Sequence, residues 1–300
     1  MMTLPLYRSF FIVVLLVLFL TFGSVATIAQ DNGGNATIKP TKTPEKSIAA
    51  LTYQKPNEIA SGNRYFGYSW PFDDRDLDQE IGDTPVFVEL YSDEACQYCS
   101  PADLFTNDLV MKTNLIIISC HVDNLGFVPD SPLLASGCFD RQGMYTARLW
   151  KRKITPDFFI NGKAEVKGYL FHQFAEELIR QAKDNPLERL NITKLAQNKY
   201  TIPLEARDFG PTEGFNDRAY VTLFEYQKPV EYKIPFGPNE GRRQVYHNVV
   251  SEIIPLMDWK GQAGDYQFTW TPSKNAAGAV IIFERKDTSI FAVGEIKLDY

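Results

Sequence analysis

Two cysteines that are two residues apart, Cys96-Gln97-Tyr98-Cys99, constrain the fold of this chain more than any other feature of its sequence. The pair follows a short run of apolar and β-branched residues, 86–91, and it precedes a stretch with apolar residues at helical spacing, 104–110. The first pattern predicts a strand that is buried on both faces, and the second predicts a helix. The cysteines are therefore expected at a turn from a buried strand into a helix.

This position gives the two thiols different roles. A thiol near the N-terminus of a helix is favoured as thiolate by the helix dipole and free amides, and a second thiol close by resolves the mixed disulfide. The spacing alone is weak evidence, because zinc sites and structural disulfides share it. Pro156 begins a later strand, where we expect a cis-proline packed against the pair and a Thr155 backbone able to pair with a substrate strand. The sequence thus predicts Cys96 and Cys99 as catalytic residues, and Thr155 and Pro156 as substrate-binding residues.

The residues around the pair predict a weakly activated thiol. Ser100-Pro101-Ala102-Asp103 is a typical helix start, with Ser100 as N-cap and proline at the first helical position. Cys96 would then lie one turn before the helix, where the dipole lowers its pKa less. Asp93 and Glu94 also disfavour the thiolate. We expect a thiol that is less acidic than in the strongest oxidants, and a disulfide that is harder to reduce.

The order of predicted elements defines the fold class. After the first strand and helix come a strand, a helix, two strands joined by the hairpin signal Asn161-Gly162, and an amphipathic helix. This βαβαββα order matches a thioredoxin-like domain, with parallel strands first and an antiparallel hairpin last. The predicted segments are 115–119, 137–150, 154–160, 164–166 and 170–183.

The pattern of apolar and polar residues changes after Pro186. Residues 190–298 hold six or seven runs of alternating apolar and polar residues, separated by turns rich in Gly, Pro and Asn. Such runs predict an all-β, sandwich-like domain. We therefore expect an α/β thioredoxin-like domain over 64–186, followed by a β-sandwich-like domain over 187–300.

The N-terminus resembles an export signal. Arg8 precedes the apolar run 10–20, and small residues at Ala26 and Ala29 suit cleavage by a signal peptidase. We expect a signal peptide over 1–29, a flexible leader over 30–63, and an exported protein of the periplasm or extracellular space. Contact with a membrane would then come only from an uncleaved signal segment.

Export would place the other two of the four cysteines, Cys120 and Cys138, under oxidising conditions. In an oxidising compartment they are expected to form a structural disulfide. Two alternatives stay open: disulfide exchange between the two cysteine pairs, and a metal site built from both residues of the pair with Cys120 and His121. His121 is otherwise expected to have a capping or hydrogen-bonding role. We predict no cofactor and no resident metal.

Several motifs stand in order along the chain: Glu89-Leu90-Tyr91-Ser92, Cys96 to Asp103, His121-Val122-Asp123, Arg141-Gln142, Thr155-Pro156, 161–165, 246–250, Asp258-Trp259 and Gly261-Gln262. Together they resemble one family, the secreted thioredoxin-like proteins grouped as domain of unknown function 1223. The resemblance covers residues 84–300 and implies a thioredoxin-like fold followed by a β domain, but no activity. The chain departs from the family pattern at Ser100, where proline is usual, and by having Gln97-Tyr98 where small residues are usual.

Three functions follow from these features. The first is an exported thiol–disulfide oxidoreductase that acts on protein thiols or disulfides. The second is a non-enzymatic binding module that holds Cys96–Cys99 as a permanent disulfide, and the third is a copper(I) chaperone. A net charge of −6 without a basic block excludes nucleic acid as a partner.

Overall fold

The computed structural model describes residues 64–65, 68–69, 77–113, 115–149, 151–209 and 217–299, which all belong to one compact unit, Leu51–Tyr300. The predicted signal peptide, 1–29, and the predicted leader, 30–63, lie outside these described residues. No helix in the described part of the chain is long and apolar enough to span a membrane. The first two strands, β1 (Arg64–Tyr65) and β2 (Tyr68–Ser69), form a short antiparallel pair.

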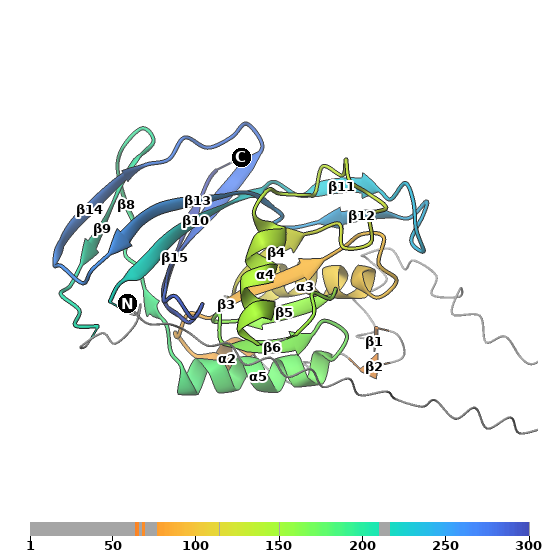
Figure 1. Ribbon diagram of the computed structural model, residues 1–300, viewed down its shortest axis with the longest axis horizontal. Helices are drawn as coiled ribbons and strands as arrows, with labels where there is room; N and C mark the ends of the chain where they lie inside the picture. Colours follow the sequence, from red (N-terminus) through yellow and green to blue (C-terminus); the bar gives the residue numbers. More distant parts are fainter. Residues whose placement is uncertain are drawn as a thin grey trace, which may run out of the picture. The chain divides into compact units, whose positions relative to one another are not determined.

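A four-stranded mixed sheet forms the first half of the described chain, with strand order β4-β3-β5-β6 (Figure 1). Strands β3 and β4 are parallel, and the other neighbours are antiparallel. This arrangement confirms the predicted order of elements, with parallel strands first and a hairpin last. The elements are α2 (Leu77–Ile81), β3 (Phe87–Ser92), α3 (Cys99–Lys112), β4 (Ile116–His121), α4 (Cys138–Arg148), β5 (Asp157–Ile160), β6 (Ala164–Lys167) and α5 (Phe171–Asp184).

Both faces of this sheet are apolar, because side chains alternate along each strand and all residues of β3 and β4 are buried. On one face, Leu90 of β3 belongs to a core cluster with Phe105 of α3 and Phe174 of α5. On the other face, Phe87 and Tyr91 pack with side chains of α4 and of the second half of the chain. The prediction of a strand buried on both faces is confirmed.

The second half of the described chain consists of strands without a helix between them. A five-stranded sheet has the order β13-β10-β15-β16-β7, a three-stranded sheet has the order β14-β9-β8, and β11 pairs with β12. Ten strands replace the predicted six or seven, and four of them have only four residues or fewer, too short to give a clear pattern in the sequence. The strands are β7 (Glu188–Arg189), β8 (Thr193–Ala196), β9 (Lys199–Leu204), β10 (Ala219–Gln227), β11 (Val230–Lys233), β12 (Arg243–Tyr246), β13 (Val250–Trp259), β14 (Gly264–Thr269), β15 (Ala276–Glu284) and β16 (Ile290–Lys297).

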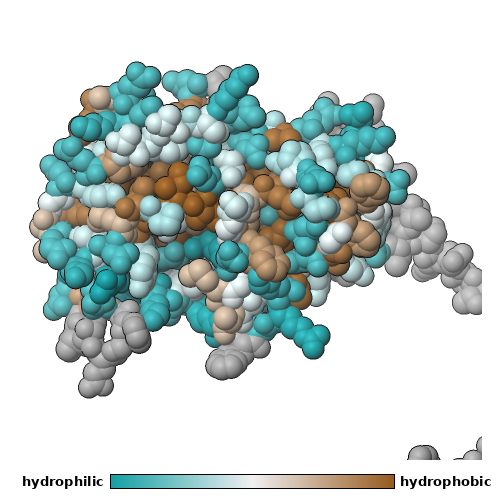
Figure 2. All heavy atoms as spheres, turned by 45° about the horizontal axis from the view of Figure 1, so that its top comes forward, coloured by the Kyte–Doolittle hydropathy of each residue, from teal (hydrophilic) through white to brown (hydrophobic). Residues whose placement is uncertain are grey.

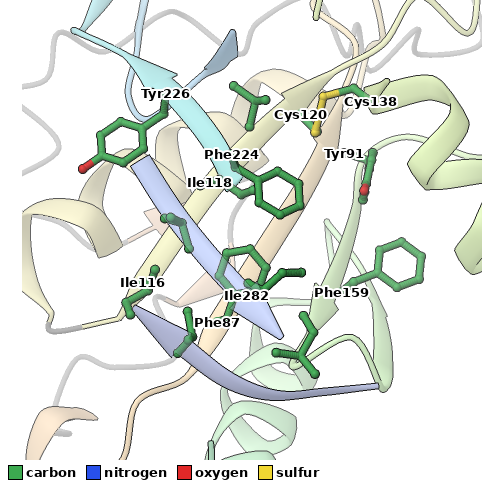
Figure 3. Packing of buried hydrophobic residues seen from close by; sticks show 14 of the residues in the cluster. Phe87, Tyr91, Ile116, Ile118, Cys120, Cys138, Phe159, Phe224, Tyr226 and Ile282 are labelled. Carbon is green, nitrogen blue, oxygen red and sulfur yellow. A yellow bond between two sulfur atoms is a disulfide. The ribbon is translucent and has the colours of Figure 1, made fainter. Parts of the chain in front are cut away.

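The two halves share one core. Figure 3 shows side chains of the five-stranded sheet pointing at the four-stranded sheet, and the rings of Phe224 and Phe87 have centroids 6.0 Å apart. Leu223 and Ile281, on the opposite face of the five-stranded sheet, pack instead with Phe268 of the three-stranded sheet. Some hydrophobic residues reach the surface, and on the face in Figure 2 they form a band between hydrophilic margins.

The predicted hairpin turn between β5 and β6 lies against this second half. Asn161 and Gly162 both have positive φ, of 50° and 64°, as a tight hairpin turn of this composition requires. A Cβ atom on Gly162 would lie 2.0 Å from the carbonyl oxygen of Thr288, and the Thr288 hydroxyl donates a hydrogen bond to the Gly162 carbonyl. Glycine is therefore needed here for backbone conformation and for close approach.

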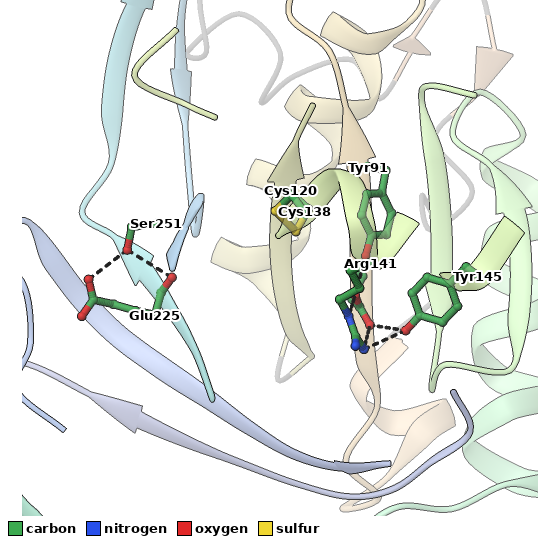
Figure 4. The surroundings of a disulfide bond; sticks show 8 residues. Tyr91, Cys120, Cys138, Arg141, Tyr145, Glu225 and Ser251 are labelled. Carbon is green, nitrogen blue, oxygen red and sulfur yellow. Dashed lines mark hydrogen bonds and ion pairs between the residues drawn. A yellow bond between two sulfur atoms is a disulfide. The ribbon is translucent and has the colours of Figure 1, made fainter. Parts of the chain in front are cut away.

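The predicted disulfide between Cys120 and Cys138 is present, with Cα atoms 5.5 Å apart (Figure 4). It joins β4 to the first residue of α4 within the core cluster that contains Tyr91. Alternation along β4 directs Cys120 to this side and His121 to the other, where Glu94 lies. Cys120 is thus bonded to Cys138 and directed away from His121, an arrangement that favours the structural disulfide over exchange between the two cysteine pairs and over a metal site that includes Cys120.

Removing this disulfide is expected to lower the free energy of unfolding by about 3 kcal/mol, because it closes a loop between residues 18 apart in the sequence. The double variant Cys120→Ala/Cys138→Ala tests this by urea denaturation. Dithiothreitol should destabilise the wild type and leave the double variant unchanged. Equal unfolding midpoints for the two proteins without reductant would contradict the expectation.

Candidate functional site

The loop between β3 and α3 carries Cys96, and α3 begins at Cys99 with Tyr98 as its N-cap. The prediction of an N-cap at Ser100 is therefore wrong. The Ser100 hydroxyl donates instead to Oε1 of Gln244 on β12, at 2.7 Å, and both side chains are buried. The helix therefore starts two residues earlier than the sequence predicts, and the Cys99 N–H donates to the Cys96 carbonyl.

The two thiols are free and differ in accessibility. Cys99 is fully buried, whereas Cys96 keeps 6% of its surface exposed. The Cys96 Sγ lies 3.4 Å from the Thr155 carbonyl oxygen, so the structure brings three of the four predicted site residues into one place. The fourth, Pro156, is joined to Thr155 by a cis peptide bond, as expected.

Pro156 is buried against Gly168, where a Cβ atom would come within 2.5 Å of the proline ring. The Gly168 N–H donates to the Pro156 carbonyl at 2.9 Å. Only glycine at this position lets the segment after β6 approach the proline so closely. Both sequence-predicted substrate residues are therefore held in place by the β5–β6 hairpin.

The pKa values of the two thiols are shifted in opposite directions. A hydrogen bond from Cys99 lowers the pKa of Cys96, against the opposing effects of partial burial and the Asp93 carboxylate. Burial raises the pKa of Cys99 well above its usual value, and the hydrogen bond to Cys96 and the charge of Asp103 act in the same direction. Asp93 disfavours the Cys96 thiolate, as the sequence indicated, but the hydrogen bond from Cys99 has the larger effect on the pKa of Cys96. The pair thus combines a slightly exposed thiol whose pKa is lowered with a fully buried thiol whose pKa is raised.

A buried acid–base cluster lies next to the pair. His121, at the end of β4, has Nδ1 3.4 Å from Oε2 of Glu94 and Nε2 3.8 Å from Oδ1 of Asp103. All three side chains are at most 2% exposed. Tyr246 of β12 contacts the imidazole edge-on, with ring centroids 5.0 Å apart. Neither oxygen of Asp103 has a hydrogen-bond partner within the described structure.

The cluster sets unusual protonation equilibria. Burial raises the pKa of Asp103 to about 7, although the nearby His121 opposes this shift. Burial disfavours the imidazolium, but the hydrogen bond to Glu94 and the charge of Asp103 outweigh it and raise the pKa of His121. Asp103 follows Cys99 by four residues on α3, which places the carboxyl and the thiol on the same helix face. A carboxyl that can exchange a proton near neutral pH therefore adjoins the buried thiol.

The second half of the chain completes the site. The loop between β11 and β12 places Asn239 against the Cys96 loop, where its buried amide donates to the carbonyls of Glu94, at 2.9 Å, and Cys96, at 2.7 Å. In the same loop, a Cβ atom on Gly237 would lie 2.8 Å from the Cβ of Ala95. The backbone around Cys96 is therefore held by residues about 140 positions further along the chain.

Sequence reasoning missed most of these supporting residues. Asp103 was interpreted as a helix-start residue, although its spacing from Cys99 was a usable signal. Asn239, Gln244 and Tyr246 carry no such signal, because only the packing of the β11–β12 hairpin brings them to the site.

Comparison with known proteins agrees with the motifs. The residue pattern that defines the family described as "Protein of unknown function (DUF1223)" matches residues 87–284. The chain belongs to this family. The matched segment contains both cysteine pairs and the β11–β12 hairpin. A comparison with curated protein sequences found no match.

Two solved structures of low sequence identity are similar to the chain. A crystal structure of an Agrobacterium tumefaciens protein from a structural genomics consortium has a TM-score of 0.59 at 17% identity, over 72% of this chain and 97% of that one. HBP35 of Porphyromonas gingivalis has a TM-score of 0.44 at 15% identity, over 72% of this chain and 76% of that one. The first likeness concerns the fold alone.

Proposed function

We propose that this member of the DUF1223 family is a thiol–disulfide oxidoreductase with a thioredoxin-like α/β half, and that Cys96 is its nucleophile. One observation carries the proposal: the accessible thiol with the lowered pKa touches the Thr155 carbonyl, while its buried partner thiol has a raised pKa. A nucleophile and a resolving thiol need this difference, because the first must be ionised and reachable and the second must stay protonated until the mixed disulfide forms.

The first step of the proposed reaction uses Cys96. Its thiolate attacks one sulfur of a substrate disulfide, forms a mixed disulfide with that sulfur, and releases the other substrate sulfur as thiolate. The Thr155 carbonyl lies beside the attacking sulfur, where it can accept a backbone hydrogen bond from an extended substrate segment.

The second step uses Cys99 and Asp103. Cys99 transfers its proton to the Asp103 carboxylate and attacks the Cys96 sulfur, which forms the Cys96–Cys99 disulfide and releases the second substrate thiolate. Two electrons thus pass from the protein dithiol to the substrate. An external dithiol returns the protein to its reduced form, and the same steps in reverse oxidise a substrate.

The Cys120–Cys138 disulfide supports an exported protein, in the periplasm or outside the cell, because buried structural disulfides of this kind form in oxidising compartments. Protein thiols or disulfides are the proposed partners there.

The test is the reduction of insulin disulfides by dithiothreitol in the presence of the protein. We expect Cys96→Ser to abolish the acceleration, because no nucleophile remains. Cys99→Ser should accumulate a mixed disulfide at Cys96 that mass spectrometry detects. Turnover that persists in Cys96→Ser would exclude the proposal, and so would a wild-type Cys96–Cys99 disulfide that dithiothreitol does not reduce.

A further inference from the structure

Exposed apolar side chains gather around the loop that carries Cys96. Nine large hydrophobic side chains are exposed among the described residues, and five of them lie on segments bonded or adjacent to this loop. Isolated exposed apolar residues are ordinary, but a group around a reactive thiol indicates a surface for a partner. We call these five residues the apolar rim: Tyr98, Leu125, Phe127, Tyr169 and Phe236.

Two members of the apolar rim lie beside the predicted substrate residues. Tyr98 stands between the two cysteines, and its ring lies against that of Tyr169, with centroids 6.0 Å apart. Tyr169 directly follows Gly168, which packs on the Pro156 ring. This aromatic pair therefore reaches from the cysteine loop to the cis-proline segment.

Two further members come from the turn after β4. The Leu125 N–H donates to Oδ2 of Asp93 at 3.2 Å, while Oδ1 of the same carboxylate accepts the Ala95 N–H at 3.0 Å. One carboxylate thus ties this turn to the Cys96 loop, and Leu125 and Phe127 are presented next to it.

The fifth member comes from the β11–β12 hairpin. Phe236 is 59% exposed although it adjoins Gly237, whose backbone lies against Ala95. Prolines at 235 and 238 restrict the backbone on both sides of it, so holding the ring in place costs little conformational entropy. The two prolines and the hydrogen bonds of Asn239 hold the backbone next to Phe236, so its exposed ring has a defined position beside the Cys96 loop.

We propose that the apolar rim docks an extended protein segment with aromatic or aliphatic side chains next to its cysteine, and that Phe236 of the second half determines this specificity. The proposal rests on the proposed oxidoreductase function. Carboxylates near Cys96 disfavour small anionic disulfides such as that of glutathione, because Asp93 accepts a hydrogen bond from Ala95 in the Cys96 loop and Asp123 accepts one from Phe127 of the apolar rim.

The experiment compares two peptides with the same internal disulfide, one flanked by Phe and Leu and the other by Ser and Asp. Wild-type protein should reduce the apolar peptide with a kcat/KM at least about tenfold higher. Phe236→Ser should raise KM for the apolar peptide about tenfold, with kcat unchanged and the polar peptide unaffected. Met111→Ser is the matched control, because Met111 is 73% exposed at the far end of α3.

A binding measurement separates this inference from the function on which it rests. An apolar peptide with serine in place of cysteine should bind the wild type and lose affinity in Phe236→Ser, as followed by fluorescence anisotropy. Such binding without any disulfide exchange would contradict the oxidoreductase function alone. Disulfide exchange that is equally fast for both peptides would overturn the proposal that the apolar rim docks substrate. A wild-type dimer in sedimentation velocity that Phe236→Ser dissociates would also overturn it, because the rim would then be covered by a second copy of the chain.

Discussion

Replacing Arg141 by alanine is expected to lower the free energy of unfolding by about 3–5 kcal/mol, because the change leaves two buried carboxylates without their cation. Arg141, on α4, donates to both oxygens of Glu89 on β3, at 2.6 and 2.8 Å, and to both oxygens of Glu284 on β15, at 3.0 and 3.1 Å. Tyr145 also donates to Glu89 (Figure 4). The network thus joins the four-stranded sheet, a helix and the five-stranded sheet.

Chemical denaturation of the wild type and of three variants tests this expectation. Arg180→Ala is the matched control, since Arg180 is about half exposed on α5 and pairs with Glu177 at the surface, where such pairs contribute about 0–1 kcal/mol. Arg141→Lys should fall between the two, because an ammonium keeps the charge but cannot bond both carboxylates in the same way. If Arg141→Ala were as stable as the control, the network would have no net role in joining the two halves.

Asp103→Asn is expected to slow the resolving step, the attack of Cys99 on the mixed disulfide, by about a hundredfold at neutral pH. Burial holds the pKa of Asp103 at about 7, so the wild-type rate should rise as pH increases through 7 and the carboxyl becomes able to accept the proton. Asparagine cannot accept it, and the rise should disappear. Stopped-flow measurement of thiol release from a preformed mixed disulfide at Cys96 gives this rate directly.

Two comparisons isolate the role of Asp103 as a base. Asp108→Asn, on the same helix, should leave the resolving rate and its pH dependence unchanged. Alkylation of Cys96 by iodoacetamide should proceed at a similar rate in all proteins, because it does not need the Cys99 proton to leave. An Asp103→Asn rate that equals the wild-type rate at every pH would refute the role.

The same substitution is expected to raise stability at high pH. The folded protein keeps the Asp103 proton up to a pKa of about 7, whereas the unfolded chain releases it near its ordinary value of about 4. The free energy of unfolding of the wild type therefore falls as pH rises through this window. Asp103→Asn lacks this loss, so above pH 7 it should be more stable than the wild type, which urea denaturation at pH 5 and 8 measures. A carboxyl kept at such a cost to stability is consistent with a catalytic role.

The sequence by itself determined the local features of the site. The strand before Cys96, the helix that contains Cys99 and the Asn161-Gly162 turn all depend on residues close to one another along the chain. Alternation, helical spacing and turn preferences record such short-range conformations, because each reflects how one stretch of backbone buries its apolar side chains.

The tertiary structure alone decided what surrounds the thiols. The Ser100 hydroxyl donates to Gln244 rather than capping α3, and the backbone at Cys96 is bonded to Asn239. The contact of Asp103 with His121 arises because α3 packs beside β4. No periodic pattern records these contacts, since a side chain's partner across 18 or 140 residues is fixed by how the elements pack. The cysteine pair was thus evident from its own stretch of sequence, whereas its chemistry depends on distant residues from both halves of the chain.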